Sequence, residues 1–276
     1  MRPATELDNF FLRYGPWALI TGASSGIGEE FAKQLASRGF HLLLCARRKD
    51  RLDQLRSELS EQHDVAVKTV QADLSQPAGV HILNEAGEGL EIGLVISNAG
   101  AEFHGPFLTQ NPDRLAALVQ LHILTPVLLA HAFGHQMRNR ERGGMLFVSS
   151  ITAMGPVPYL AHYAATKAFL FHFGGSLSHE WKKANVDVTV LLPGITDTEM
   201  ITKAVQTGVD LSQAPFPLGE VSHVVRSGLQ ALGNKTAVVP GLMNKCLFVL
   251  FNRLLPRKLS ILVLGKLMEK ALHLKA

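Results

Sequence analysis

Three side chains suited to proton transfer occur in SSITAMGPVPYLAHYAATKA, the stretch at 149–168. Tyr163 has a lysine, Lys167, four residues later, whereas Tyr159 has another tyrosine at that spacing. Residues four apart share a helix face, so the ammonium of Lys167 would lie beside the Tyr163 phenol. A nearby positive charge lowers the pKa of a tyrosine from its usual value of about 10. We therefore expect Tyr163 to act as general acid in reduction and general base in oxidation.

A glycine-rich segment, TGASSGIG at 21–28, separates an apolar run from a helical pattern. We expect Gly22 to permit the turn, Gly26 to admit a phosphate, and Gly28 to bring the helix close to the sheet. The helix N-terminus would present free N–H groups and a positive dipole to a pyrophosphate. A plain tight turn needs glycine too, but the position between strand and helix favours a dinucleotide. The predicted contacts in this loop are Gly22, Ser24, Ser25, Gly26, Ile27 and Gly28.

The end of the second apolar run, CARRKD, predicts which dinucleotide binds. An NAD site usually has an acid here to hold the ribose 2′-hydroxyl, but this chain has Ala46. Arg47 and Arg48 follow, and arginine suits a 2′-phosphate. We therefore predict NADP, with Arg47 favoured over Arg48. Asp73, which precedes Leu74 after the third run, is placed to meet the adenine or to begin a helix.

These side chains require a scaffold of alternating strands and helices. The apolar runs are nearly continuous, which is typical of strands covered on both faces of a parallel sheet. Their alternation with helical patterns predicts a doubly wound α/β fold of about seven strands, a Rossmann fold. The expected strands are 17–21, 41–46, 65–71, 92–97, 144–150, 186–193 and a weaker one at 236–240. Long helices are expected at 112–137 and 162–183.

Composition limits the class of protein. The 276 residues are 47% hydrophobic and 18% charged, so a large core is available. The two cysteines, Cys45 and Cys246, are far apart and fit no metal spacing, which indicates a reduced, cytoplasmic protein. The start of the chain lacks the pattern of a signal peptide. The formal charge of +4 is concentrated in the last 35 residues, so nucleic-acid binding is not indicated.

Together these motifs resemble the short-chain dehydrogenase/reductase family over about 17–240. The resemblance rests on the glycine segment, on Asn98–Gly100 (NAG), on a serine before Y-x-x-x-K, and on PGITDT at 193–198. It implies an NADP-dependent oxidoreductase acting on C=O or CH–OH groups, assembled as a homodimer or homotetramer. The family's serine lies 13 residues before the tyrosine, which selects Ser150 over Ser149 to polarise the carbonyl. Lys167 would also hold the nicotinamide ribose. The remaining implied cofactor contacts are Asn98, Ala99, Gly100, Tyr163, Pro193, Gly194 and Thr198.

Two positions depart from the family pattern. Ser97 stands where a second asparagine is common, which is a mild change. His122 stands where the family carries an asparagine that anchors a relay water. A histidine there could hold the water or relay a proton, or it could be a buried structural residue. His131 and His135 lie one helical turn apart, but no third ligand is evident and we expect no metal site.

The substrate pocket is expected to be apolar. Predicted substrate contacts are Ala153, Tyr159 and His104, with Phe103, Met154, Val157 and Gly194 nearby. Residues 198–218 have the composition of a mobile lid. We therefore expect a hydrophobic ketone, aldehyde, or steroid- or lipid-derived carbonyl as the substrate, or the corresponding alcohol.

The chain is expected to divide into a domain at 1–241 and a basic amphipathic helical tail at 242–276. The tail has seven basic residues and one acid, and Asn252, Arg253 and Pro256 interrupt it, so it should not span a bilayer. It could lie on an anionic membrane, pack on the lid, or contact a partner subunit. Some family members without the tyrosine or lysine do not catalyse, so an NADP-binding sensor or scaffold is the alternative function.

Overall fold

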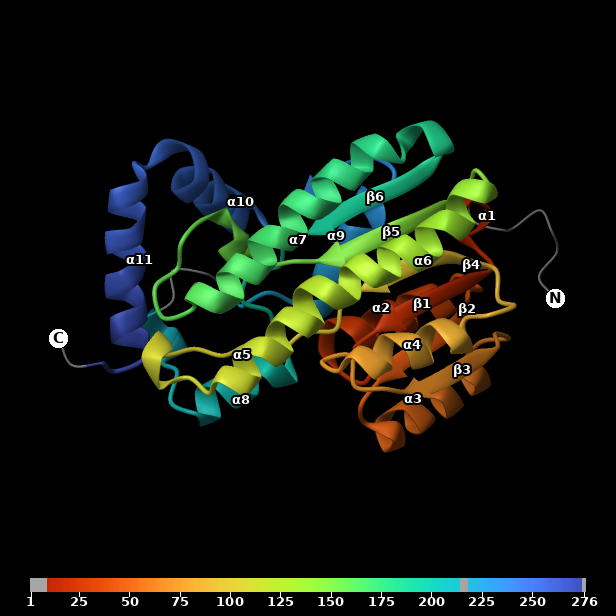
Figure 1. The fold of residues 1–276 in the computed structure, drawn as a ribbon, viewed down its shortest axis with the longest axis horizontal. Coiled ribbons are helices and arrows are strands. Elements are labelled where there is room, and N and C mark those ends of the chain that lie inside the picture. The colour runs from red at the N-terminus through yellow and green to blue at the C-terminus, as the bar shows by residue number, and fades with distance from the viewer. Residues whose placement is uncertain (1–8, 214–217, 275–276) are drawn as a thin grey trace.

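Seven parallel strands form one sheet in the order β3-β2-β1-β4-β5-β6-β7 (Figure 1). The computed structural model describes residues 9–213 and 218–274. The strands are β1 (Trp17–Thr21), β2 (His41–Ala46), β3 (Val67–Gln71), β4 (Ile92–Ser97), β5 (Gly143–Val148), β6 (Val186–Leu191) and β7 (Ala237–Val238). Each expected strand is present, and several end a few residues earlier than their apolar runs. The predicted doubly wound fold is confirmed.

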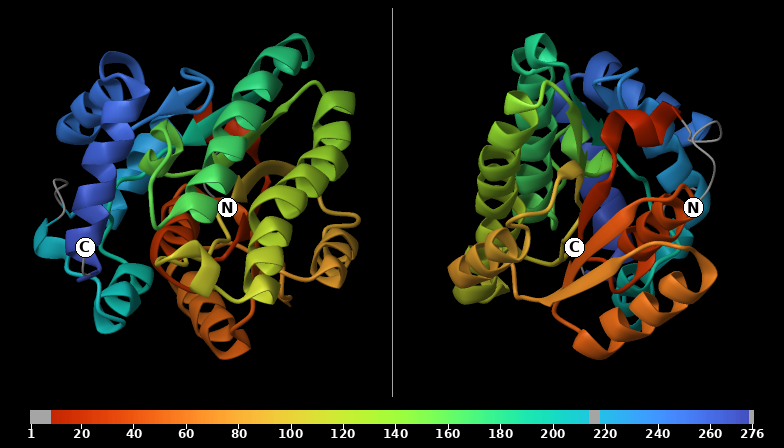
Figure 2. Two further views of the ribbon diagram at one scale, coloured as in Figure 1. Left: turned by 60° about the vertical axis from the view of Figure 1, so that its left-hand side comes forward. Right: turned by 90° about the vertical axis from the view of Figure 1, so that its right-hand side faces the viewer.

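Helices cover both faces of the sheet, as the views in Figure 2 show. One face carries α2 (Gly26–Ala36), α3 (Lys49–Gln62) and α9 (Val221–Ala231). The other carries α4 (Pro77–Ala86), α6 (Thr125–Asn139) and α7 (Ala161–Glu180). The remaining helical elements are α1 (Asn9–Tyr14), η2 (Phe107–Thr109), α5 (Pro112–Val119), η3 (Gln120–Leu124), η4 (Ile151–Met154), η5 (Lys182–Ala184), α8 (Glu199–Gln206), η6 (Leu211–Gln213), α10 (Leu242–Val249), η7 (Leu250–Leu254) and α11 (Arg257–Ala271).

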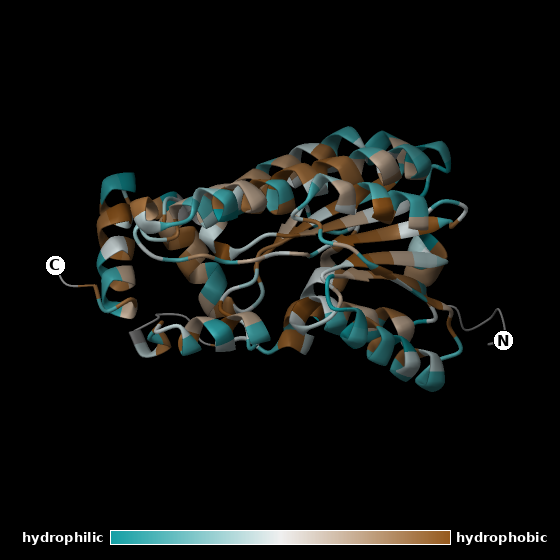
Figure 3. Cartoon of the chain, turned by 60° about the horizontal axis from the view of Figure 1, so that its bottom comes forward, coloured by the Kyte–Doolittle hydropathy of each residue, from teal (hydrophilic) through white to brown (hydrophobic). Residues whose placement is uncertain are grey.

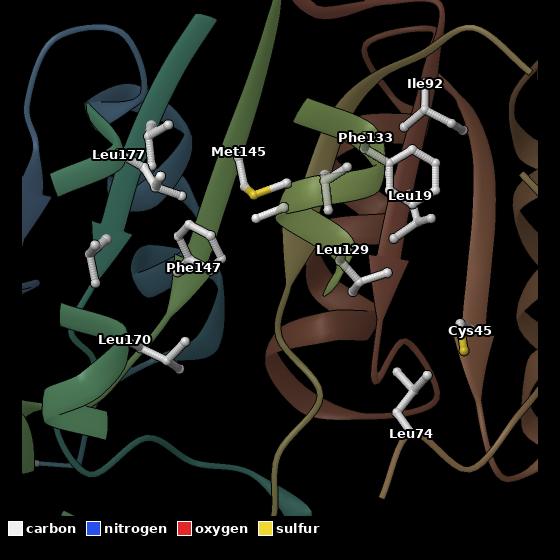
Figure 4. Close-up of a cluster of buried hydrophobic side chains, with 14 of the residues drawn as sticks. Leu19, Cys45, Leu74, Ile92, Leu129, Phe133, Met145, Phe147, Leu170 and Leu177 are labelled. Carbon is white, nitrogen blue, oxygen red and sulfur yellow. The ribbon is translucent and has the colours of Figure 1, made fainter. Parts of the chain in front are cut away.

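Two hydrophobic layers hold the sheet in place. Every residue of β4 is buried, because helices pack on both of its faces. Figure 4 shows one layer, in which Leu129 and Phe133 of α6 meet Leu19 and Ile92 of the sheet. The strands are accordingly the most hydrophobic part of the ribbon in Figure 3. A rigid sheet of this kind fixes the positions of the loops at its strand ends.

The strand order reverses between β1 and β4, where the chain crosses from one side of the sheet to the other. In open α/β sheets, ligands bind beyond the carboxyl ends of the strands at such a point. The glycine segment follows β1 and the Asn98–Gly100 segment follows β4. The topology therefore brings the two cofactor motifs together, although about 75 residues separate them in sequence.

Helices α10 and α11 of the tail form the left end of the molecule in Figure 1, opposite α1. Helix α10 packs over Gly194, where an added Cβ would lie 2.7 Å from Asn244 Nδ2. Helix α11 contacts Pro158 through Gly265, and the residue before η6 through the bond from Asp210 N to Ala271 O. Residues 275–276 of the expected tail lie outside the described part, as do residues 214–217 of the expected lid.

One helical stretch among the described residues, Pro112–Asn139, is long and apolar enough to cross a membrane by composition. It combines α5, η3 and α6, and its side chains Leu118, Leu129, Phe133 and Met137 are buried in the protein. Packing on the sheet is therefore a sufficient reason for its hydrophobicity.

Candidate active site

The glycine segment forms a cradle in which the backbone itself is the binding surface. Gly22 and Gly26 have φ of +68° and +57°, a region that favours glycine. A Cβ at Gly28 would lie 2.3 Å from Gly22 O, so the helix can approach the β1 loop only without a side chain. Ser25 is the N-cap of α2, but its side chain makes no capping bond. The first N–H groups of α2 can thus serve an anion, and the residues present fit a dinucleotide pyrophosphate.

The loop after β4 is bonded to the loop after β1. Asn98 Nδ2 donates to Thr21 O at 2.9 Å, and Thr21 Oγ1 accepts the N–H groups of Asn98 and Ala99 at 2.9 and 3.0 Å. A Cβ at Gly100 would lie 3.7 Å from Lys167 Nζ. The expected NAG segment therefore lies between the glycine cradle and α7.

Arg48, rather than Arg47, faces the cofactor loop. Its guanidinium donates to Ser25 Oγ at 2.7 Å and to Ser24 Oγ at 3.1 Å, and it also bonds Glu199. Arg47 is exposed. The side chains of adjacent residues leave the strand end in different directions, and only contacts across the fold show which one turns inward. Which arginine would bind the 2′-phosphate, with Arg47 favoured by the sequence, stays a prediction.

The other expected cofactor residues occupy this end of the sheet with different local roles. Asp73 Oδ1 accepts from the N–H and hydroxyl of Ser75, so it organises the turn after β3. The buried Leu74 accepts a bond from Thr125 through its carbonyl. Several of the expected cofactor residues line one cavity: Ile27, Asn98, Gly100, Pro193, Gly194 and Thr198. Thr198 also lies against the cradle, since a Cβ at Gly26 would be 3.0 Å from its Cγ2.

Ser150, Tyr163 and Lys167 are buried and line one cavity. Helix α7 positions Tyr163 and Lys167, with Lys167 Nζ 5.7 Å from the Tyr163 ring centroid and donating to Val148 O at 3.0 Å. Ser149 also borders the cavity, but its hydroxyl donates to Lys167 O at 2.7 Å. Ser150 follows β5 in extended conformation and its Oγ accepts from Thr152 N at 3.2 Å. Because Ser150 Oγ is the acceptor in that bond, its own hydroxyl proton can be donated to a group in the cavity.

The electrostatics differ from the expectation of a lowered tyrosine pKa. Burial and the nearby Glu102 raise the pKa of Tyr163, opposed by its hydrogen bond with Ser150. Burial lowers the pKa of Lys167 to about 8, and the Glu102 charge opposes that change. Desolvation is the largest of these contributions, and a raised pKa favours the protonated phenol.

Glu102 is a site residue that sequence reasoning missed. It lines the same cavity, and burial raises the pKa of its carboxyl while the Lys167 charge lowers it. It does not form a direct ion pair with Lys167. No spacing rule points to a lone glutamate in a loop, and the only available signal was its position two residues after Gly100.

His122 does not have a free ring nitrogen for relaying a proton. It lies in η3, a π-helical turn, and is buried. Its Nε2 accepts from Ala101 N at 3.1 Å, and its Nδ1 is 2.9 Å from Thr166 Oγ1. Because Nε2 accepts, Nδ1 carries the proton and donates to Thr166, whose hydroxyl donates to Tyr163 O. Burial lowers the pKa of His122 well below its usual range. The geometry is that of a positioning residue for the loop before Glu102 and for α7, and a relay role for His122 stays a prediction.

The whole cavity has a volume of about 240 Å³. The walls of its substrate end are apolar. None of the three predicted substrate contacts lies in those walls. Ala153 is buried in the core, His104 lies outside the cavity, and Tyr159 donates its hydroxyl to Glu269 of α11 at 3.0 Å. The walls instead come from the loop before α7, the lid and the tail, through Val157, Leu160, Met200, Ile201, Ala204, Val209, Leu211, Leu264, Leu267, Met268 and Ala271. The lid expectation agrees with this wall, whereas the involvement of the tail was one of three open alternatives.

The two histidines of α6 are exposed, with ring centroids 4.7 Å apart. In the described part of the chain, neither His131 nor His135 belongs to a group of three or more potential metal ligands.

Comparison with known proteins agrees with this geometry. A family model described as short chain dehydrogenase matches residues 16–208. A very-long-chain 3-oxoacyl-CoA reductase of Anas platyrhynchos is 34% identical over 67% of this chain, which spans 61% of that relative. A solved structure of a 7β-hydroxysteroid dehydrogenase superposes with a TM-score of 0.84, at 26% identity over 94% of this chain and 100% of the other.

A short-chain dehydrogenase from Sphingobium yanoikuyae, solved in complex with NADPH, has a TM-score of 0.77 and 33% identity over 83% of this chain and 89% of the other. The matched region contains the glycine cradle, the NAG loop, and the serine, tyrosine and lysine of the cavity. This chain belongs to the short-chain dehydrogenase family of oxidoreductases, which bind a nicotinamide cofactor and act on carbonyl or alcohol groups.

Proposed function

We propose that this protein is an NADP(H)-dependent oxidoreductase that interconverts a hydrophobic carbonyl compound and its secondary alcohol. One observation carries the proposal. Ser150, Tyr163 and Lys167 line a single cavity that reaches Ile27 of the glycine segment and the Asn98–Gly100 loop, and that has apolar walls at its other end. A hydride donor and a hydrophobic acceptor held at those two ends would meet at the three polar groups.

The three side chains divide the proton chemistry between them. The bound nicotinamide would supply or accept the hydride. The Ser150 hydroxyl donates a hydrogen bond to the carbonyl oxygen and polarises it. The Tyr163 phenol gives its proton to that oxygen as negative charge develops there. Lys167 holds the nicotinamide ribose and returns a proton to Tyr163. The raised pKa of Tyr163 supports reduction, since the phenol stays protonated and available as a donor.

Several observations support NADP over NAD. Ala46 leaves the end of β2 without a carboxylate, and Arg48 places its guanidinium on the hydroxyls of Ser24 and Ser25. That donor set suits a phosphate. The Sphingobium relative was solved with NADPH.

The substrate class follows from the walls of the cavity. Its substrate end is formed mainly by aliphatic side chains of the loop before α7, of α8 and of α11. Relatives include a 3-oxoacyl-CoA reductase and a hydroxysteroid dehydrogenase, whose names specify elongated, largely apolar carbonyl or alcohol compounds. We propose a carbonyl or alcohol on an acyl chain or a fused-ring skeleton as the substrate.

The decisive experiment compares Tyr163→Phe with the wild type for NADPH oxidation over a panel of hydrophobic ketones and aldehydes. Loss of the acid should lower turnover by about 10²–10⁴-fold with the Kd for NADPH unchanged. Tyr159→Phe is the matched control, because it removes a phenol outside the cavity. Equal, negligible turnover in all three proteins, with tight NADPH binding, would instead support the NADP-binding sensor or scaffold.

The tail supports a further proposal, that the protein binds peripherally to anionic membranes from the cytoplasmic side. Its described surface exposes large apolar side chains, with Leu242 at 77% and Leu254 at 69% exposure. Exposed bases accompany them: Lys245, Arg253, Arg257, Lys258, Lys266 and Lys270. The acid Glu269 is bonded to Tyr159. Apolar groups beside positive charge suit a membrane interface.

Sedimentation with vesicles tests this proposal. The wild type should sediment with phosphatidylserine vesicles and remain soluble with phosphatidylcholine. Lys258→Glu with Lys266→Glu should abolish sedimentation, whereas the control pair Lys182→Glu with Lys183→Glu, exposed on η5, should not. Sedimentation that both pairs leave unchanged would refute a role for the tail. The homodimer or homotetramer stays a prediction.

A further inference from the structure

An ion pair joins Arg48, which also bonds the glycine loop, to the lid. Arg48 immediately precedes α3, and Glu199 is the first residue of α8. Arg48 Nη1 donates to both carboxylate oxygens of Glu199, at 2.8 and 3.0 Å. These residues are 151 positions apart, so the bond connects regions that only the fold brings together. Both side chains remain about one third exposed.

The rest of the same guanidinium is directed to the cradle. Nη2 donates to Ser25 Oγ at 2.7 Å and Ser24 Oγ at 3.1 Å, and Nε is 3.3 Å from Ser24 Oγ. The single guanidinium of Arg48 therefore donates to two hydroxyls and one carboxylate. Two hydroxyls and a guanidinium are donors that a phosphate would accept, and the oxygens of Glu199 now occupy the anion's place on Nη1.

Glu199 is suited to occupy Arg48 when no other anion is bound there, and to be displaced from Arg48 when one binds. Its bonds with Arg48 and then Lys203 lower the pKa of Glu199 to about 2, so it is fully ionised at neutral pH. Lys203 lies on the same helix with Nζ 3.0 Å from Glu199 Oε1. The carboxylate would thus keep a cationic partner if Arg48 were taken by another anion.

We propose that Glu199 competes with the 2′-phosphate of NADP(H) for Arg48, and thereby sets the cofactor preference and ties the lid to the cofactor loop. This inference rests on the proposed NADP dependence. A phosphate carries about two negative charges and three acceptor oxygens, so it displaces a single carboxylate. NADH brings no such group and leaves the pair intact. Binding of NADPH then removes one tether of α8, whose Met200, Ile201 and Ala204 line the substrate end.

The test uses ligands that isolate the phosphate contact. Adenosine 2′,5′-bisphosphate and adenosine 5′-monophosphate differ by the phosphate in question, and calorimetry measures both without turnover. Glu199→Gln keeps the shape and removes the charge, so it should tighten the bisphosphate by about tenfold and leave the monophosphate within about twofold. Glu220→Gln, at the start of α9, is the control for net charge. An unchanged or weaker affinity for the bisphosphate in Glu199→Gln would overturn the competition.

Hydrogen exchange of the α8 amides provides the second measurement. In the wild type, exchange at 199–206 should become faster with the bisphosphate, because Arg48 releases Glu199. In Glu199→Gln it should be fast from the start. Exchange that the bisphosphate does not change in the wild type would show that Glu199 stays on Arg48, which contradicts the proposal. A wild type that binds NADPH no more tightly than NADH would overturn the NADP assignment itself, a result separate from the response to Glu199→Gln.

Discussion

The two ends of the cavity are built in different ways. At the nucleotide end, backbone meets backbone: Gly28 packs on the Gly22 carbonyl, and Asn98 bonds the end of β1. At the substrate end, side chains from the loop before α7, from α8 and from α11 make the walls. Polar links there are few among the described residues, and include Tyr159 to Glu269 and the bond from Asp210 N to Ala271 O.

This difference shows what each end can tolerate. A backbone contact closer than a Cβ allows only one residue type, so the nucleotide end depends on glycines at fixed positions. A wall of aliphatic side chains accepts other side chains of similar volume, so the substrate end can change without loss of the fold. Changes at the nucleotide end should therefore have large effects, and changes at the substrate end small and selective ones.

The largest effect should come from Gly28→Ala. Its Cβ would lie 2.3 Å from Gly22 O, and backbone at that distance must move. We expect a loss of about 3 kcal/mol in the free energy of unfolding, together with loss of NADPH binding. Urea unfolding and cofactor fluorescence measure these. Gly175→Ala is the control, since its Cβ would have nothing within 4 Å, and it should be neutral or stabilising. Equal stability of the two variants would contradict the claim that the nucleotide end depends on glycine at this position.

His122→Ala should be next in size. It removes a buried ring and leaves Ala101 N–H and the Thr166 hydroxyl without their partner, at a cost of about 3 kcal/mol. His131→Ala, exposed on α6, should cost almost nothing. His122→Asn should recover part of the stability and leave the pH profile of turnover in place. A profile that moves would restore His122 as a relay member.

Glu102→Gln should shift a pH profile more than it affects stability. Glu102 raises the pKa values of Tyr163 and Lys167, so its removal lowers both. Alcohol oxidation requires the Tyr163 phenolate, and its acid limb should therefore move to lower pH by about one unit. Reduction requires the protonated phenol, so the basic limb of its pH profile should also move to lower pH. Glu102→Asp keeps the charge and should retain most of the wild-type profile. An acid limb that does not move in Glu102→Gln would remove Glu102 from the site.

The smallest effect should come from Tyr159→Phe. It breaks the bond to Glu269, which should lower the stability only slightly. Because α11 supplies part of the apolar wall, we expect KM for a long apolar ketone to rise about threefold, while a short ketone is unaffected. Steady-state kinetics with the two substrates measures the split. Equal changes for both ketones would place Tyr159 at the reacting carbonyl after all.

Prediction from sequence also differed between the nucleotide end and the substrate end of the cavity. Strands were predictable, because burial on both faces leaves an uninterrupted apolar run. The glycine cradle was predictable from its spacing, and the resemblance to a family identified Ser150, Tyr163 and Lys167. At the substrate end the outcome is mixed. Val157, Gly194 and the expected lid line the cavity, whereas Ala153, His104 and Tyr159 lie outside its walls, and their contact with a substrate stays a prediction.

The sequence by itself determined the parallel α/β sheet, the cofactor loop and the helical pair of Tyr163 and Lys167. Each depends on periodicity or on a backbone conformation, which a few neighbouring residues fix. Only the tertiary structure decided that Arg48 faces the loop, that His122 has both ring nitrogens bonded, that Glu102 joins the site, and that α11 closes the cavity. Those facts are contacts between residues far apart in the chain, and local pattern carries no information on which distant side chains meet.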